Sequence, residues 1–129
     1  MQTGVVELAT PEGLNQEQAD LEDVARDWVC VWCRQKVASD KDRWFHQGRS
    51  EFSFENPEGL RFEILTFSRT LGCRNVGMPT LEHTWFAGYA WSYCVCAGCR
   101  SHLGWYYTGP GSFAGLIRSR ILRAAWVSN

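Results

Sequence analysis

Four cysteines arranged as two C-x-x-C pairs carry the clearest metal-binding chemistry in this sequence. The pairs are Cys30-Val-Trp-Cys33 and Cys96-Ala-Gly-Cys99. Each pair can place two thiolates on one tight turn, at distances that suit a tetrahedral zinc ion. Together they predict one structural Zn²⁺ site with four sulfur ligands and no open position for activating water. Two redox pairs or buried free thiols are the alternative interpretation.

The spacing between the two pairs predicts what must lie between them. Cys33 and Cys96 are separated by 62 residues, far more than the roughly 15–20 residues of a compact zinc ribbon. Several strands must therefore connect the pairs. The remaining cysteines, Cys73 and Cys94, are interpreted as small apolar fillers, with a reactive role as the alternative.

A second group of residues could bind a flat ligand. Trp85, Trp91 and Trp105 bracket the second cysteine pair, and Tyr107 faces the same way as Trp105 on a strand. Gly88 allows the chain between Trp85 and Trp91 to bend and bring both rings together. Three converging indoles would form a cage, whereas simple packing in the core of a small sheet is the alternative.

Composition limits the classes of function. The chain has 129 residues, of which 45% are hydrophobic and 14% aromatic, and this suits one globular domain. Basic residues form no run, so nucleic acid is not expected as a partner. No apolar run approaches the roughly twenty residues of a membrane span. Residues 1–9 lack the features of a signal peptide, which indicates a cytoplasmic protein.

Charge and periodicity divide the chain. Residues 1–27 hold seven acidic groups against Arg26, a net charge of −6. We therefore expect an acidic, flexible tail over residues 1–24, with at most one helical turn, and a domain over residues 25–129. Alternating residues predict an all-β domain. The expected strands are 44–46, 52–54, 60–64, 89–95, 103–108 and 113–122, with a loop over Gly72 to Pro79.

The aromatic segment and the second cysteine pair also carry a family motif. The sequence resembles the CULT domain of the cereblon family over roughly residues 28–122. The resemblance rests on His83-Thr84-Trp85-Phe86-x-Gly88-Tyr89-Ala90-Trp91, Cys99-x-Ser101-His102-Leu103-Gly104-Trp105, Asn56-Pro57-x-Gly59, Gly77-x-Pro79-Thr80 and Phe113-x-Gly115-Leu116-x-Arg118-Ser119. The chain has no room for the further regions of eukaryotic cereblon, so it is similar to the single-domain bacterial relatives.

The resemblance implies a fold and a ligand. It implies a β-tent, in which a four-cysteine zinc pins two antiparallel sheets. It also implies a pocket for cyclic imides, such as the glutarimide ring of thalidomide, and for uridine-like rings. The walls are then Trp85, Trp91 and Trp105, completed by Tyr107. Backbone groups around His83 bind the ring, and Asn56 and Pro57 lie on a loop that closes over it.

Three hypotheses of function follow from these residues. The first is a non-catalytic module that binds a free cyclic imide or uracil-like ring. The second is an enzyme of the methionine sulfoxide reductase B type, for which Cys73 or Cys94 would have to supply the nucleophile. The third is a module that recognises protein chain ends, because a C-terminal Asn or Gln can cyclise to the same imide ring.

Overall fold

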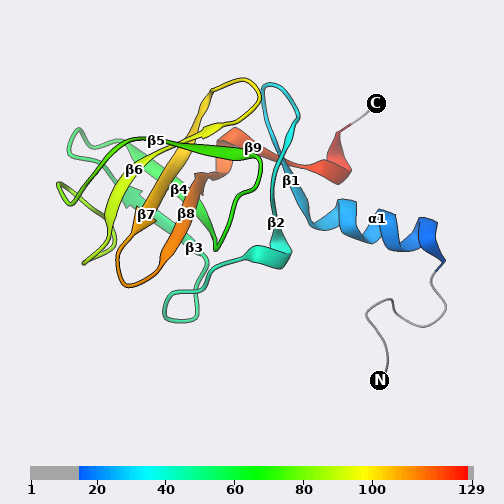
Figure 1. Cartoon of the computed structure of the whole chain (residues 1–129), viewed down its shortest axis with the longest axis horizontal. Coiled ribbons are helices and arrows are strands. Elements are labelled where there is room, and N and C mark those ends of the chain that lie inside the picture. Colours follow the sequence, from blue (N-terminus) through cyan, green and yellow to red (C-terminus); the bar gives the residue numbers. More distant parts are fainter. Residues whose placement is uncertain (1–14, 128–129) are drawn as a thin grey trace.

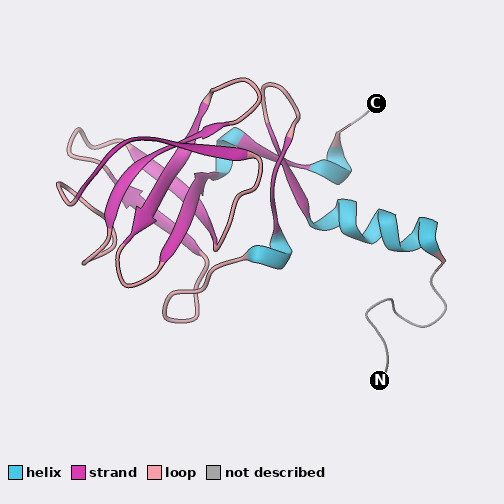
Figure 2. Ribbon diagram, in the orientation of Figure 1, coloured by secondary structure: helices cyan, strands magenta, loops and turns pink. Residues whose placement is uncertain are grey.

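Two antiparallel sheets make up most of the structure, a computed structural model that describes residues 15–127 (Figures 1 and 2). The smaller sheet has the strand order β2-β1-β9, and the larger has the order β3-β4-β8-β7-β6-β5. The predicted all-β fold of two antiparallel sheets is confirmed. The strands are β1 (Asp27–Cys30), β2 (Lys36–Ser39), β3 (Glu51–Glu55), β4 (Arg61–Phe67), β5 (Cys73–Thr80), β6 (Ala90–Cys96), β7 (His102–Thr108), β8 (Ser112–Ile117) and β9 (Ile121–Arg123). The helices are α1 (Gln16–Arg26) and the short 3₁₀ turns η1 (Asp40–Asp42), η2 (Arg118–Arg120) and η3 (Ala124–Trp126).

Alternation along the strands gives the larger sheet two apolar faces. One face packs against the smaller sheet, where Trp28, Val37 and Ile121 meet Phe67 and Leu116 of the larger sheet in one buried cluster. Each of these side chains is at most 2% exposed. Burial of a large apolar side chain contributes about 2 kcal/mol, so this layer holds the two sheets together.

The second face of the larger sheet is covered by a loop rather than by a sheet. The segment between β5 and β6, residues 81–89, lays Phe86 onto this face. The Phe86 ring lies edge-on to Tyr107 and to Phe113, with centroid distances of 4.9 Å in both cases. Trp44, in the segment between η1 and β3, stacks on Phe113 with 3.6 Å between the ring centroids. An aromatic cluster therefore replaces a third layer on the face where the predicted cage residues lie.

The predicted loop over Gly72 to Pro79 is wrong, because all of these residues except Gly72 belong to strand β5. Residues 73–76 pair regularly with β6, after which the register shifts and Thr80 pairs with Trp91. Gly77 takes a positive φ of 93° inside this irregular stretch. Proline and glycine are tolerated here because β5 is an edge strand, where one row of backbone groups needs no partner.

The predicted single strand over 113–122 is interrupted in the structure. β8 ends at Ile117, the 3₁₀ turn η2 follows, and β9 then joins the smaller sheet. The alternation of residues continues from β8 into β9. Alternation with a period of two therefore cannot reveal that the chain passes from one sheet to the other. The predicted strand over 44–46 is absent as well, because only isolated bridges flank it. Trp44 is held there by ring packing on Phe113.

The acidic segment contains more helix than one turn. α1 has 11 residues and projects away from the sheets (Figure 1). Asn15 caps it, since its side chain accepts a hydrogen bond from Gln18 N–H at 2.8 Å and the Gln18 side chain accepts one from Asn15 N–H at 3.0 Å. This capping box was the signal in the sequence for a longer helix. Residues 1–14 of the predicted tail lie outside the described residues. Within residues 15–127, no helix is long and apolar enough to cross a membrane.

Asp40 anchors the smaller sheet through three donors. Trp28 Nε1 donates to Asp40 Oδ1 at 2.8 Å, Arg43 donates to the same oxygen at 3.1 Å, and Arg123 pairs with Oδ2. The Arg123 guanidinium also lies 4.1 Å from the Trp28 ring centroid. Burial alone would raise the pKa of Asp40, but the hydrogen bonds from Trp28, Arg123 and Arg43 outweigh it and lower the pKa.

We therefore expect Asp40→Asn to lower the free energy of unfolding by about 2 kcal/mol, because charge-assisted hydrogen bonds are lost. Folding lowers the pKa of Asp40, so ionised Asp40 stabilises the folded state fully above its unfolded-state pKa of about 4. This stabilisation disappears as the pH falls through the lower pKa that Asp40 has in the folded state. Urea denaturation at pH 7 and at lower pH measures it. Asp23→Asn is the control, because its ion pair with Lys41 is exposed and its loss should cost under about 1 kcal/mol. Equal effects of both variants would contradict the assignment.

Candidate functional site

The two cysteine pairs form the same local turn in different sheets. In the first, Cys30 C=O accepts a hydrogen bond from Arg34 N–H at 2.9 Å, and in the second, Cys96 C=O accepts one from Arg100 N–H at 2.9 Å. Arg34 and Arg100 both have a φ of 67°, which closes each turn tightly. The first turn connects β1 to β2, and the second connects β6 to β7. The cysteine cluster therefore joins the smaller sheet to the larger one.

The four sulfurs fit a tetrahedral ion. Cys30 Sγ lies 3.7 Å from Cys99 Sγ, and Cys33 Sγ lies 3.5 Å from Cys96 Sγ. All four sulfurs lie within 4.8 Å of one another, and none is in a disulfide. Zinc–sulfur bonds of about 2.3 Å place tetrahedral sulfurs about 3.8 Å apart, close to these distances. The predicted metal-binding cluster is thus confirmed as a geometry, with two buried and two exposed cysteines.

The thiols of the cluster lie in different environments, which shift their pKa values in opposite directions. A hydrogen bond with the Ser101 hydroxyl, at 3.1 Å, lowers the pKa of Cys99 to about 6. Burial raises the pKa of Cys30 to about 12. A dication that binds all four sulfurs would offset this cost of ionising Cys30. Four sulfurs also complete a tetrahedral shell, so the cluster suits a structural role.

Two of the three predicted cage rings are in direct contact. Trp85, in the loop between β5 and β6, lies edge-on to Trp105 of β7, with 4.9 Å between centroids and 78° between planes. Trp91 projects from the same face of the sheet, because its cross-strand partner is Tyr107 and Trp105 lies diagonally across. Its nearest ring among the described residues is Tyr93, at 5.5 Å. All three indoles are half-buried, so part of each ring remains open to a ligand.

Hydrogen bonds fix two of the indoles to the loops around them. Trp85 Nε1 donates to Glu55 C=O at 3.0 Å, at the end of the β3–β4 hairpin. Trp91 Nε1 donates to Glu82 C=O at 2.7 Å. Among the hydrogen bonds of residues 15–127, none involves the indole N–H of Trp105. The indole N–H groups of Trp85 and Trp91 are therefore used internally, which leaves the ring faces for other contacts.

Asn56 and Pro57 lie at the tip of the β3–β4 hairpin, beside the carbonyl that binds Trp85. Asn56 Oδ1 accepts hydrogen bonds from Glu58 N–H at 3.0 Å and from Leu60 N–H at 2.9 Å. Asn56 N–H also donates to Leu60 C=O at 2.9 Å. The tip is thus a hydrogen-bonded turn, with Pro57 exposed on it.

His83 has an unusual backbone, with a φ of 57°. This left-handed conformation is uncommon for residues other than glycine and is often found at functional sites. No hydrogen bond within residues 15–127 engages the C=O of His83 or the N–H of Trp85. The side chain is exposed, and its Nε2 lies 3.9 Å from a Glu82 carboxylate oxygen. One backbone acceptor and one backbone donor are therefore available beside the indoles.

Tyr107 lies deeper than the predicted pocket wall. The side chain is 1% exposed, stacks on Phe113 at 4.8 Å and meets the edge of Phe86. Burial raises the pKa of its hydroxyl well above the ordinary value. Tyr107 is thus a core residue packed against Phe86 and Phe113, and it is not an open wall.

Sequence reasoning missed two rings that pack against the predicted cage residues. Phe54 stacks on Trp85 at 5.0 Å, and Phe62 lies edge-on to Trp105 at 5.3 Å. Both come from the β3–β4 pair, where they are cross-strand partners. Their alternation identified a hairpin, but the direction in which its apolar face points depends on how the hairpin packs. Phe54 and Phe62 therefore act as positioning residues for two walls.

His102 connects the cysteine cluster to the cage along β7. Its ring lies edge-on to Trp105 at 5.2 Å. Arg120 donates to His102 Nδ1 at 3.2 Å, which leaves Nε2 as the donor to Gly104 C=O at 2.8 Å. Burial lowers the pKa of His102, so the neutral ring is favoured. His102 is therefore a hydrogen-bonded structural residue.

Comparison with curated proteins relates the chain to protein cereblon. Protein cereblon of Danio rerio is 30% identical over 113 residues, which cover 81% of this chain and 26% of the relative. The chain carries a cereblon-like domain. Protein cereblon of Gallus gallus is 38% identical over 76 residues, covering 54% of the chain and 17% of the relative. Protein cereblon of Drosophila willistoni is 36% identical over 111 residues, covering 79% and 18%.

The chain spans about a quarter or less of the length of these curated relatives. No model of a known protein family matches the sequence. The similarity therefore concerns one cereblon-like region that holds a four-cysteine cluster and a tryptophan-rich face.

Proposed function

We propose that this domain is a non-catalytic binding module that holds a cyclic imide, such as a glutarimide or a uridine-like ring, against Trp85, Trp91 and Trp105. The C=O of His83 and the N–H of Trp85, which have no hydrogen-bond partner within residues 15–127, are the observation that carries the proposal. An imide presents one N–H donor between two carbonyl acceptors. The ring N–H can donate to His83 C=O while one ring carbonyl accepts from Trp85 N–H.

The indoles supply the other half of the recognition. A flat ring loses water on both faces when it contacts aromatic walls, and a few placed polar groups then fix its orientation. Asn56 and Pro57, at the hairpin tip beside Trp85, are the residues we propose to close over the ligand. Tyr107 supports the base of the pocket from below.

We propose Zn²⁺ as the ion of the four-cysteine cluster and a structural role for it. Cys96 ends β6 and Cys99 precedes β7, the strands that carry Trp91 and Trp105. An ion at this turn would fix the two strands, and therefore two cage walls, relative to each other. The module begins near residue 25, with the acidic segment 1–24 as an appendage, and the six free cysteines suit a cytoplasmic protein.

A reductase activity is the weaker hypothesis. Cys94 is 2% exposed and Cys73 is half-buried, and the neighbouring Cys94 thiol together with desolvation raises the pKa of Cys73 well above the ordinary value. A nucleophilic cysteine needs a lowered pKa and access to substrate. Neither nucleic acid nor a membrane is proposed as a partner. A protein C-terminus that ends in a cyclic imide would offer the same ring and is the second candidate ligand.

Titration of the zinc-loaded protein with glutarimide tests the proposal. We expect quenching of tryptophan fluorescence that saturates, because the ring contacts at least two indoles. N-methylglutarimide is the matched control, since it lacks the N–H and should bind about tenfold more weakly or worse. No quenching by glutarimide in a folded, zinc-loaded sample would overturn the proposal. Comparing a peptide that ends in a cyclic imide with free uridine then distinguishes the two sources of the ring.

A further inference from the structure

Cys73 and Cys94 are the two cysteines outside the metal cluster, and they share one face of the β5–β6 pair. Cys73 lies opposite Cys96 in the antiparallel register, and Asn75 lies opposite Cys94. Cys73 and Cys94 are therefore diagonal neighbours whose side chains leave the same side of the sheet. Cys94 belongs to the buried cluster between the two sheets, and Cys73 packs against that cluster. Neither thiol has a role in the proposed imide site or in the four-cysteine cluster.

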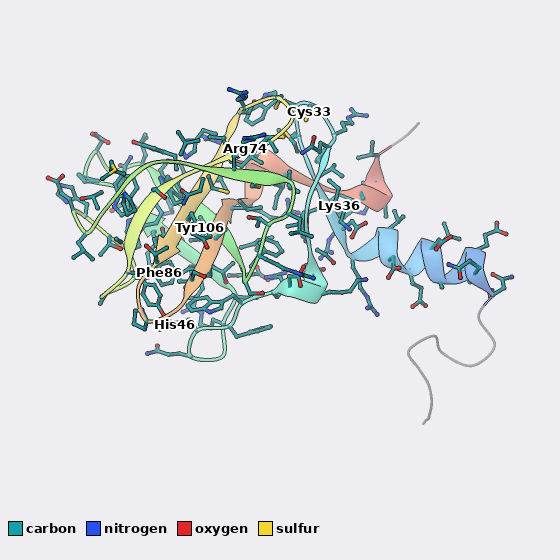
Figure 3. The ribbon with its side chains drawn as sticks, viewed as in Figure 1. Cys33, Lys36, His46, Arg74, Phe86 and Tyr106 are labelled. Carbon is teal, nitrogen blue, oxygen red and sulfur yellow. The ribbon has the colours of Figure 1, made fainter. Side chains whose placement is uncertain are left out.

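Both thiols line a cavity of about 230 Å³. The other walls come from β5, from Tyr106 of β7 and from the turn that precedes β5, residues 68–71. Figure 3 labels Arg74 and Tyr106, two of the lining residues. None of the cage tryptophans lines this cavity. A water occupies about 30 Å³ in the liquid, so the cavity has room for an ion and several waters.

The register favours an ion between the thiols over a disulfide. Diagonal neighbours across two antiparallel strands are about 7–8 Å apart, whereas a disulfide needs Cα atoms about 4.4–6.8 Å apart. The two sulfurs can therefore point toward each other without forming a disulfide bond. An ion held between them needs no shift of the backbone, which is already constrained by the register of Cys73 with Cys96.

The lining of the cavity also selects the type of ion. No histidine or carboxylate lines it, so the two sulfurs are the only strong ligands that it offers. Zinc prefers four ligands of sulfur, nitrogen or carboxylate type, and calcium and magnesium need oxygen shells. Two thiolates suit a soft ion of low coordination number. The neutral polar residues of the lining, Ser68, Thr70, Asn75 and Tyr106, offer only weak ligands.

We propose that Cys73 and Cys94 form a second metal site, for a soft monovalent ion of the Cu(I) type. In the binding step, two S–H protons leave to solvent, two sulfur–metal bonds form, and the oxidation state of the metal does not change. The half-buried Cys73 receives the ion from the cavity, and the buried Cys94 completes the pair. This site is distinct from the four-cysteine cluster and does not depend on the imide proposal.

Anaerobic titration of the zinc-loaded protein with Cu(I), in competition with a chromophoric Cu(I) chelator, tests the proposal. We expect the wild-type protein to take up about one equivalent without losing zinc, which a zinc indicator measures in parallel. Cys73→Ser should weaken this uptake about tenfold or more while zinc stays bound, because one of two strong ligands is gone. Cys94→Ser is the second variant, and Cys73→Ala decides alone if Cys94→Ser does not fold.

Ser68→Ala is the matched control, because Ser68 lines the same cavity but offers no soft ligand. It should bind Cu(I) as the wild type does. Two results would overturn the proposal. One is that Cys73→Ser binds Cu(I) as tightly as the wild type. The other is that Cu(I) releases zinc in equal amounts from both proteins, which would place the ion in the four-cysteine cluster.

Discussion

Replacing Cys96 with serine is expected to unfold the domain rather than to alter its binding of ligand. Structural zinc contributes roughly 10–16 kcal/mol of apparent binding free energy in zinc-finger peptides, which is comparable to the whole stability of a small domain, about 5–15 kcal/mol. Cys96 is fully buried and faces Cys33 Sγ at 3.5 Å, at the point where the two sheets are joined. Without this ligand, the turns of both sheets lose their common anchor.

Circular dichroism and zinc content measure this effect together. The Cys96→Ser variant should lose the strand signal and bind less than one zinc, and a chelator should have the same effect on the wild type. Cys73→Ser is the matched control, because Cys73 lies directly opposite Cys96 across the strands but outside the cluster. It should keep both the fold and the zinc. A folded Cys96→Ser protein without bound metal would show that the cluster is dispensable for the fold.

Replacing Trp105 with alanine is expected to weaken glutarimide binding more than tenfold while the domain stays folded. Trp105 meets Trp85 edge-on at 4.9 Å and is half-buried, so its loss removes one wall of the cage. An aromatic wall at the centre of a binding site is typically worth about 2 kcal/mol or more, which corresponds to more than tenfold in Kd. Trp85→Ala should act in the same direction, although it also removes the hydrogen bond to Glu55 C=O.

Isothermal titration calorimetry with glutarimide gives the change in Kd, and zinc content confirms that the cluster is intact. Trp126→Ala is the matched control, because Trp126 is 68% exposed on η3 and lies outside the aromatic face of the larger sheet. Its Kd should equal that of the wild type. If both Trp105→Ala and Trp85→Ala bind glutarimide with the affinity of the wild type, these indoles do not form the binding site, whatever the zinc content.

The residues that could be predicted without a structure are those whose chemistry depends on short spacing. Two C-x-x-C pairs define two metal-binding turns, because three consecutive peptide units already bring the sulfurs together. The large separation of Cys33 and Cys96 then required strands between them, and β2 to β6 lie there. Alternation likewise located the β3–β4 pair and strands β6 and β7, since a side chain's face of the sheet follows from its parity.

Other features depended on contacts between distant residues. β5 was missed because Gly77 and Pro79 are read locally as loop residues, and only its place at the sheet edge makes them acceptable. The change of sheet at η2 was missed because alternation is the same on both sides of it. The positions of Phe54 and Phe62 against the cage were also invisible, because they depend on how the hairpin packs.

The four cysteines and the tryptophans were thus identified by the sequence alone, because residue type and short spacing determine what each can bind. The tertiary structure decided how they are combined. It brought the cysteine pairs of two sheets within 4.8 Å of one another, placed Trp85 against Trp105, and buried Tyr107 beneath Phe86. These relations arise from packing between residues that are far apart in the chain, and local patterns carry no information about which distant surfaces meet.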